Sequence, residues 1–218
     1  NMDDVKALVI GAKSQFRLFF SESTDAATDS HAIIGAVRQY NEGQSWEFGL
    51  LQGFLVSCCT SGSISTNPIT EYVLHGGHDG KVYRQEVGNS FNGSDIYAQY
   101  SMPYLDFGNP MLRKTPYKIW VFTRPEGDVT LNTELTFDWG NATAINPSSF
   151  STATTGDPAI YGEAVYGTDT YDGATVPSMM TNINGSGNSM RIQFSTTNQS
   201  APYSIQAVCL IYNINGYK

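Results

Sequence analysis

Charged residues are scarce in this sequence, and the marks of several common protein classes are missing. Asp, Glu, Lys and Arg make up 15% of the 218 residues, against about a quarter in typical soluble domains. No apolar run is long enough to span a bilayer, so we expect no transmembrane segment. No charged-then-apolar signal peptide opens the chain. The net charge of −8 argues against a basic nucleic-acid footprint over the whole chain.

Cysteine is also rare, with Cys58, Cys59 and Cys209 as its three occurrences. An odd number without regular spacing does not make a disulfide framework. We therefore expect free thiols that pack as small apolar residues, in a protein assembled in a reducing cytoplasm. Because Asn1 precedes Met2, we expect a fragment, a processed product or a chain with one added residue.

Catalytic and nucleotide-binding motifs are missing as well. The sequence has no P-loop and no G-x-G-x-x-G that opens a helix. The run from Ser57 to Gly62 is not a nucleophile elbow. We therefore predict no enzyme activity, no catalytic residue and no cofactor.

Short runs with period-two alternation predict an all-β protein, since no segment keeps a helical period. In residues 1–102 the predicted strands fall into two sets. The first set is Ser14–Phe20, Ala32–Arg38 and Trp46–Gly53; the second is Leu55–Thr60, Glu71–Leu74, Lys81–Glu86 and, as a fourth strand, Ile96–Met102. Sets of about four short strands are typical of propeller blades. Two blades cannot close a ring, so we expect an incomplete propeller-like region. Val5–Ile10 is too short to assign by periodicity.

Residues 103–218 predict an antiparallel β-sandwich with long loops. The expected strands are Tyr117–Thr123, Val129–Thr133, Leu135–Trp139, Ser189–Ser195 and Tyr203–Tyr212. The last of these places Ile205, Ala207 and Cys209 on one face, and both of its faces are apolar, which predicts a central strand. Asn141–Asn188 is rich in Ser, Thr, Gly and Asn, so we expect exposed loops there, with one short strand around Ile160–Tyr166.

Several segments resemble a known family. They are Trp46–Phe48, Glu71–Glu86, Tyr104–Pro110 followed by Arg113 and Lys114, and Tyr203–Ala207 with Ile211 and Tyr212. Together they resemble bacteriophage virion structural proteins, in particular the C-terminal part of the tail nozzle and tail tubular proteins of short-tailed phages. The resemblance implies a component of the conduit through which DNA is ejected, located in the phage tail. It also implies a ring of identical copies that contacts other tail proteins and lets DNA pass without specific binding.

Two other functions stay open from the residues alone. Tyr- and Asn-rich loops such as Tyr161–Tyr171 suit a carbohydrate- or receptor-binding module, with a host-surface glycan as partner, because Tyr combines apolar area with a polar tip. A glycan-cleaving enzyme is the third. Its carboxylates would come from pairs such as Glu126 with Asp128 or Asp169 with Asp172. Asp157 with the latter pair is also a calcium candidate. We interpret all five as ordinary loop carboxylates.

Two further clusters are candidates for binding. His75, His78 and Asp79 could hold a metal, with His31 remote in sequence, but we interpret them as a polar hairpin tip and predict no metal site. The basic group is Arg113, Lys114, Lys118 and Arg124, interleaved with Tyr117 and Trp120. It could contact phosphates, and we interpret it instead as a charged strand edge or a subunit contact.

Overall fold

The computed structural model describes residues 5–20, 31–40, 43–53, 55–64, 70–125, 129–141, 143–154, 178–196 and 203–215. The described part is all-β, and its strands pair antiparallel in four sheets, none of which closes on itself. The chain divides into two compact units, Asn1–Phe91 and Asn92–Lys218. Within the described residues, no helix has the length and apolar character needed to cross a membrane.

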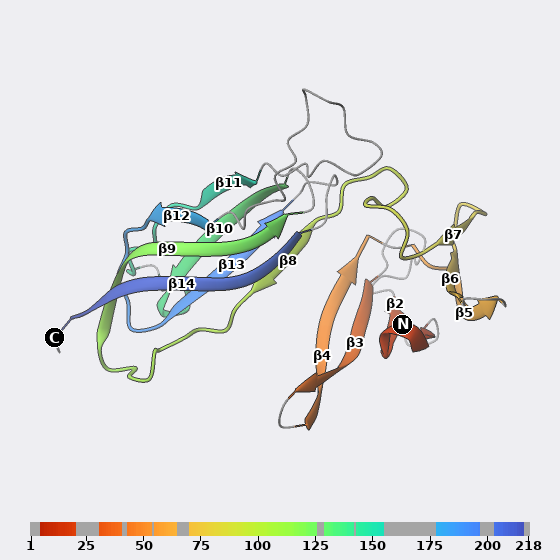
Figure 1. Cartoon of the computed structure of the whole chain (residues 1–218), viewed down its shortest axis with the longest axis horizontal. Helices are drawn as coiled ribbons and strands as arrows, with labels where there is room; N and C mark the ends of the chain where they lie inside the picture. Colours follow the sequence, from red (N-terminus) through yellow and green to blue (C-terminus); the bar gives the residue numbers. More distant parts are fainter. Residues whose placement is uncertain are drawn as a thin grey trace, which may run out of the picture. The chain divides into compact units, whose positions relative to one another are not determined.

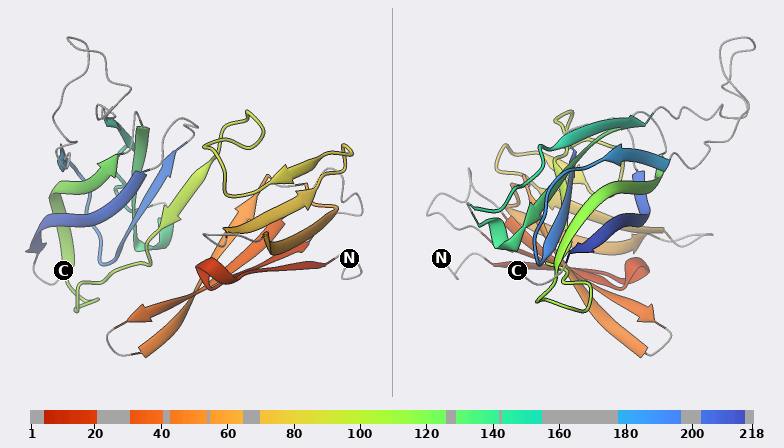
Figure 2. Two further views of the ribbon diagram at one scale, coloured as in Figure 1. Left: turned by 45° about the vertical axis from the view of Figure 1, so that its right-hand side comes forward. Right: turned by 90° about the vertical axis from the view of Figure 1, so that its left-hand side faces the viewer.

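The first sheet of unit 1 is a meander in sequence order (Figure 1). Its strands are β1 (Lys6–Ile10), β2 (Gln15–Phe20), β3 (His31–Tyr40) and β4 (Gly43–Gln52), with the 3-10 turn η2 (Gly11–Lys13) between β1 and β2. The hairpin of β3 and β4 is longer than the other two strands, and its tip extends beyond them (Figure 2). The three predicted strands are confirmed, and the unassigned Val5–Ile10 supplies the fourth.

The second sheet of unit 1 has three strands, β5 (Cys58–Ile64), β6 (Thr70–Gly76) and β7 (Val82–Arg84). The predicted turn between β6 and β7 is present, and the Gly77 N–H donates to the Lys81 carbonyl at 2.9 Å across it. Gly80 has a φ of +78°. A left-handed residue that ends a three-residue hairpin loop is a standard way to match the strand twist.

The core of unit 1 lies between its two sheets and consists mainly of aliphatic side chains. Its buried members are Leu8, Ile10, Phe19, Ala32, Val56 and Val73. Next to them Arg17 is only 5% exposed. Its guanidinium donates to Gln85 at 2.5 Å and pairs with Glu86. A buried charge is tolerated only when it is paired in this way.

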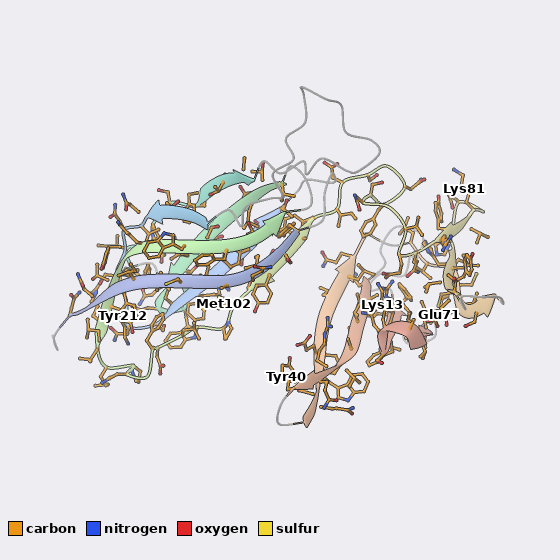
Figure 3. The ribbon with its side chains drawn as sticks, in the orientation of Figure 1. Lys13, Tyr40, Glu71, Lys81, Met102 and Tyr212 are labelled. Atoms are coloured by element: carbon orange, nitrogen blue, oxygen red, sulfur yellow. The ribbon has the colours of Figure 1, made fainter. Side chains whose placement is uncertain are left out.

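A carboxylate from the second sheet caps the turn in the first. Glu71 on β6 accepts hydrogen bonds from the backbone N–H groups of Gly11 at 3.0 Å and Ala12 at 2.7 Å. Lys13 at the end of the same turn pairs with Glu86. Figure 3 labels Lys13 and Glu71. These bonds satisfy the donors that a short helix leaves open, so they tie the two sheets together by polar contacts as well as by the core.

Unit 2 contains two further sheets. One has the order β11-β10-β13-β8 and the other β12-β9-β14. The elements are β8 (Ala98–Ser101), β9 (Arg113–Pro125), β10 (Val129–Phe137), the 3-10 turn η3 (Asp138–Gly140), β11 (Phe150–Thr154), β12 (Ser178–Asn182), β13 (Met190–Thr196) and β14 (Tyr203–Asn215). The strand predicted around Ile96–Met102 corresponds to β8. It pairs with β13, so its assignment to the second set of unit 1 was wrong.

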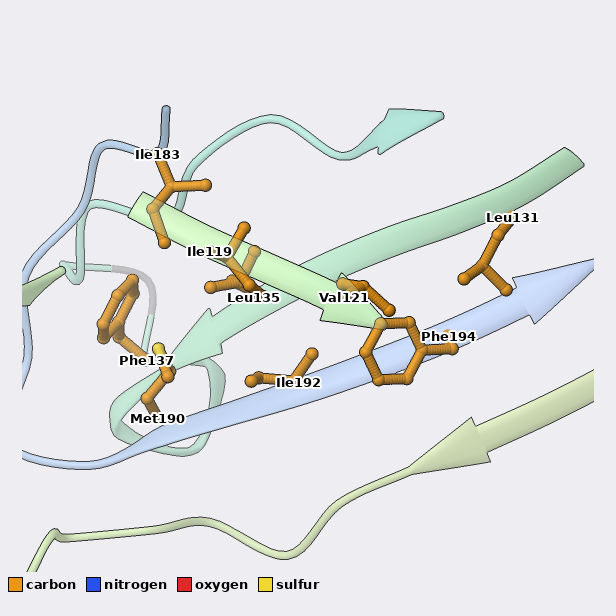
Figure 4. Packing of buried hydrophobic residues seen from close by; sticks show 9 residues of the cluster. All are labelled: Ile119, Val121, Leu131, Leu135, Phe137, Ile183, Met190, Ile192 and Phe194. Atoms are coloured by element: carbon orange, nitrogen blue, oxygen red, sulfur yellow. The ribbon is translucent and has the colours of Figure 1, made fainter. Parts of the chain in front are cut away.

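One hydrophobic cluster joins the two sheets of unit 2 (Figure 4). Ile119 and Val121 come from β9, and they meet side chains of β10 and β13 from the other sheet. The remaining buried members are Leu131, Leu135, Phe137, Ile183, Met190, Ile192 and Phe194. On β10 and β13 these apolar side chains alternate with more exposed ones, as the period of two predicts.

The last strand departs from its prediction. β14 pairs only with β9 among the described strands and lies at the edge of its sheet. A bulge between Ile205 and Ala207 shifts the register, so Ile205 and Val208 both pack against the core whereas Cys209 is exposed. An extra residue in one strand exchanges its two faces, and simple alternation therefore assigned Ala207 and Cys209 to the wrong side.

The segment predicted as loops also contributes regular structure. β11 and β12 both lie within Asn141–Asn188, and Ile183 is buried in the core of unit 2. The short strand predicted around Ile160–Tyr166 and the Tyr161–Tyr171 loop lie outside the described residues.

Candidate interaction surface

The side of the first sheet that faces away from the core of unit 1 is apolar across all four strands, with polar residues at its two ends, where His31 pairs with Gln52 and Gln39 with Gln44. Alternate residues on each strand point to this side, as the pairing of Phe16 with Gly35 and of Gly35 with Phe48 shows. We call it the apolar outer face. Its members are Val5, Ala7, Val9, Phe16, Leu18, Phe20, Ile33, Gly35, Val37, Trp46, Phe48 and Leu50.

Three aromatic rings form the centre of this face. The ring centroids of Phe16 and Trp46 are 5.5 Å apart, and those of Trp46 and Phe48 are 6.3 Å apart in a stacked arrangement. Gly35 between them makes this possible, because a Cβ there would lie 2.3 Å from Cε1 of Phe16. The missing side chain on β3 lets the Phe16 ring lie across the strand.

The apolar outer face is largely open to solvent. Trp46 is 53% exposed, Phe48 68% and Leu50 61%. On the same face Val9 is 65% exposed, Val5 50% and Ile33 38%. Such a surface is unfavourable in water, which makes this face a candidate interaction site.

Charged side chains of the long hairpin lie on the opposite side from the aromatic rings. Arg38 on β3 bonds to Glu47 on β4 at 3.1 Å, and the Tyr40 hydroxyl donates to the same carboxylate. The hydrogen bond from Tyr40 lowers the pKa of Glu47. Figure 3 labels Tyr40 near the hairpin tip. The described part of the apolar outer face therefore carries no Asp, Glu, Lys or Arg.

The sequence located β2 but did not reveal which of its sides faces the core, so this surface was not predicted. Phe16 and Leu18 alternate with Gln15 and Arg17, which predicts that the apolar residues face the core. In the structure Arg17 and Phe19 are buried instead. One sequence signal could have revealed the face. Both β2 and β4 carry an aromatic or aliphatic residue at every second position, and Gly35 on the strand between them leaves room for large rings.

The predicted histidine cluster is a structural hairpin. His75 on β6 is buried, stacks on Tyr83 at 5.2 Å, and its Nδ1 lies 3.2 Å from the Gln85 amide. Burial lowers the pKa of His75, which Asp79 partly opposes. Asp79 accepts from the Tyr83 hydroxyl at 2.6 Å. Among the described residues, no group of three or more His, Cys, Asp and Glu side chains could hold a metal ion.

The predicted basic group does not form one surface. Lys114 is buried and donates to the carbonyls of Asn109 and Asn188. Arg113 donates to Ser186, at 2.6 Å to its hydroxyl. These cations hold loops of unit 2 in place. Tyr117 is exposed, and the side chain of Arg124 lies outside the described part.

The remaining candidates have mixed outcomes. Glu126, Asp128, Asp157, Asp169 and Asp172 lie outside the described residues. All three cysteines are free thiols. Cys59 is half-buried and packs against the core of unit 1, whereas Cys58 and Cys209 are exposed, so only Cys59 packs as a core residue.

Comparisons with known proteins add no relative to this picture. No protein-family model matches the chain, and no curated protein matches it either.

Proposed function

We propose that this chain is a structural component of a phage tail, of the nozzle or tubular type, that helps to form the conduit for DNA ejection. Its role is to assemble and not to catalyse. The observation that carries the proposal is the apolar outer face, which presents aromatic rings to solvent in a chain otherwise well supplied with polar residues. The resemblance of Trp46–Phe48 and Glu71–Glu86 to phage tail proteins is the reason for proposing a location in the phage tail.

The proposed occupant of the apolar outer face is the same chain in a neighbouring position of a ring. The face carries no charge in its described part, so it can meet another copy without electrostatic repulsion. Its most exposed members, Trp46, Phe48 and Leu50, lie at every second position of one strand and offer a continuous apolar strip to such a neighbour. A ring uses one interface repeatedly, which suits a conduit.

The finer architecture belongs to the same proposal. We regard the meander β1–β4 as one propeller-like blade and β5–β7 as a second, incomplete one, and unit 2 as a β-sandwich. Sequential strand order in both sheets of unit 1 and the core shared by the two sheets of unit 2 support this description. In an incomplete propeller the last blade has no neighbour, so its apolar face stays exposed.

The location is tested by electron microscopy of virions labelled with an antibody against this chain. We expect label on the tail, together with a ring of copies in the three-dimensional reconstruction, assembled in the host cytoplasm before release. Label on the capsid shell, or no label on any particle, would contradict the proposal. A reconstruction in which a different tail protein covers Trp46 and Phe48 would keep the tail role and replace the occupant.

A further inference from the structure

The turn that follows β10 has an unusual backbone. Asp138, Trp139 and Gly140 all have positive φ angles, of 48°, 57° and 72°. Left-handed conformations cost non-glycine residues about 1–2 kcal/mol each, so something must hold Asp138 and Trp139 there. Strain of this kind clusters at functional sites.

Hydrogen bonds from three sides fix the turn. Oδ1 of Asp138 accepts from the backbone N–H groups of Asn188 at 2.8 Å and Ser189 at 2.9 Å. The Asn141 N–H donates to the Asp138 carbonyl at 3.1 Å. The Phe137 N–H donates to the Asn146 side chain at 2.8 Å. The conformation of Trp139 is therefore set by the fold.

The result of this arrangement is a rigid aromatic platform. Trp139 is 74% exposed, and its ring lies 5.3 Å from that of Tyr104 at an angle of 30°. The guanidinium of Arg191 lies over the Tyr104 ring, with its Cζ 5.3 Å from the ring centroid. Neither the core cluster of unit 2 nor a strand pairing includes Trp139. Its exposure is a property that folding does not require.

A polar surface adjoins the platform. Thr136 pairs with Arg191, and Glu134 with Gln193, on the side of β10 and β13 that faces away from the core. We call this side the polar outer face. It consists of Thr130, Asn132, Glu134, Thr136, Arg191, Gln193, Ser195, Gln99 and Ser101. Arg191 to Ser195 extend over about 13 Å of strand, enough for a short chain of sugars.

Existing hydrogen bonds hold part of this surface in place. Ser101 donates to Gln193 at 2.9 Å, and Tyr97 donates to Gln99 at 2.7 Å. The Arg191 Nε is buried and has no hydrogen-bond partner in the described structure. Preorganised amides and hydroxyls beside an exposed indole match a ligand that has both an apolar ring face and many hydroxyls.

We propose that Trp139 and Tyr104 with the polar outer face form a binding site for an uncharged oligosaccharide. A pyranose ring stacks its C–H face on Trp139, and its hydroxyls bond to Gln193, Glu134 and Arg191. Single-stranded nucleic acid also stacks on aromatic rings. However, single-stranded nucleic acid needs a basic groove for its phosphates. The carboxylate of Glu134 on this face and the net charge of −8 of the whole chain both oppose phosphate binding. The site lies in unit 2 and does not depend on the assembly role.

The test is a glycan array of neutral oligosaccharides built from glucose, galactose, mannose and N-acetylglucosamine, followed by calorimetry with the best binder. We expect Trp139→Ala to weaken binding by about tenfold or more, as the loss of one stacked aromatic contact predicts. Trp139→Phe should retain most of the affinity. Gln193→Ala should weaken binding about threefold or more, the loss of one hydrogen bond.

Tyr117→Ala is the matched control, since it removes an exposed aromatic ring from β9, in the other sheet of unit 2, and should leave glycan affinity unchanged. Melting curves of all variants check that they fold. Absence of binding on the array, equal affinity for Trp139→Ala and the wild type, or tighter binding of a poly-dT oligonucleotide would each overturn the proposal. A failure here leaves the association of unit 1 through Trp46 and Phe48 untouched, so the two proposals are tested separately.

Discussion

The two units expose sheet faces of opposite character. The apolar outer face of unit 1 presents Trp46, Phe48 and Leu50 at every second position of β4. The polar outer face of unit 2 presents Glu134, Gln193 and Ser101, and the Ser101 hydroxyl donates a hydrogen bond to Gln193. Both faces come from strands that also supply a buried core. This difference is the basis of the two proposals, in which a protein surface covers the outer face of unit 1 and a polar ligand binds the outer face of unit 2.

The largest expected effect separates core from surface. Phe194→Ala should destabilise the chain by about 3–5 kcal/mol, because it leaves a cavity between the two sheets of unit 2. Phe48→Ala should change the free energy of unfolding by less than about 0.5 kcal/mol, since its ring is exposed. Chemical denaturation at a concentration that keeps the chain monomeric measures both. Comparable losses would mean that unit 1 already covers Phe48 by itself.

A second pair of variants tests the bulge in β14. Ile205→Asp should cost about 2–3 kcal/mol, because it places a carboxylate against the core of unit 2. Ala207→Asp should cost less than about 0.5 kcal/mol, since the bulge turns Ala207 outward. Thermal melting compares them. If the two substitutions destabilise equally, the register without the bulge would be correct.

The close approach at Gly35 gives a third comparison. Gly35→Ala should destabilise unit 1 by about 1–2 kcal/mol, since the new methyl group displaces the Phe16 ring. Gly49→Ala is the control on the adjoining strand, where no atom lies within 4 Å of the added carbon. Urea denaturation should show a loss for the first and none for the second. An unaffected Gly35→Ala would mean that the aromatic cluster repacks freely.

The smallest expected effect is a change in pH dependence. Burial by itself raises the pKa of Glu86, but hydrogen bonds from Lys13 and Arg17 outweigh it and lower the pKa below the ordinary value. Because the pKa of Glu86 is lower in the folded state, the ionised carboxylate stabilises the fold above pH 4.5. This stabilisation is lost as the pH falls through the lowered pKa. Glu86→Gln should flatten the acid side of the stability profile. Glu134→Gln, on an exposed residue, serves as the control, and a parallel profile for both variants would contradict the role of Glu86.

Strand positions could be predicted from sequence, but the faces of several strands could not. Period-two alternation located most strands. It failed on β2 because Arg17 is buried by partners that lie far along the chain, Gln85 and Glu86. On β14 one extra residue reversed the pattern after Ile205. Both errors have the same physical origin, since alternation gives the period of a strand and not which side meets the core.

The candidate sites were harder to predict for a related reason. Trp139 was expected to continue a strand, and its left-handed turn depends on the Asp138 carboxylate meeting the backbone of Asn188 and Ser189. Nothing in the local sequence specifies that contact. The hairpin that carries His78 and Asp79 was easier to predict, because the pairing of β6 with β7 uses short-range turn chemistry, whereas the burial of His75 on β6 was not predicted.

The central claim is that the apolar outer face is an interface between copies of this chain. Light scattering over a range of concentrations measures it most directly. We predict that the wild type self-associates, that Trp46→Ser with Phe48→Ser gives a folded monomer, and that Tyr97→Ser, which removes an exposed aromatic residue from unit 2, associates like the wild type. A wild-type chain that stays monomeric at every concentration, or a double variant that associates unchanged, would contradict the claim.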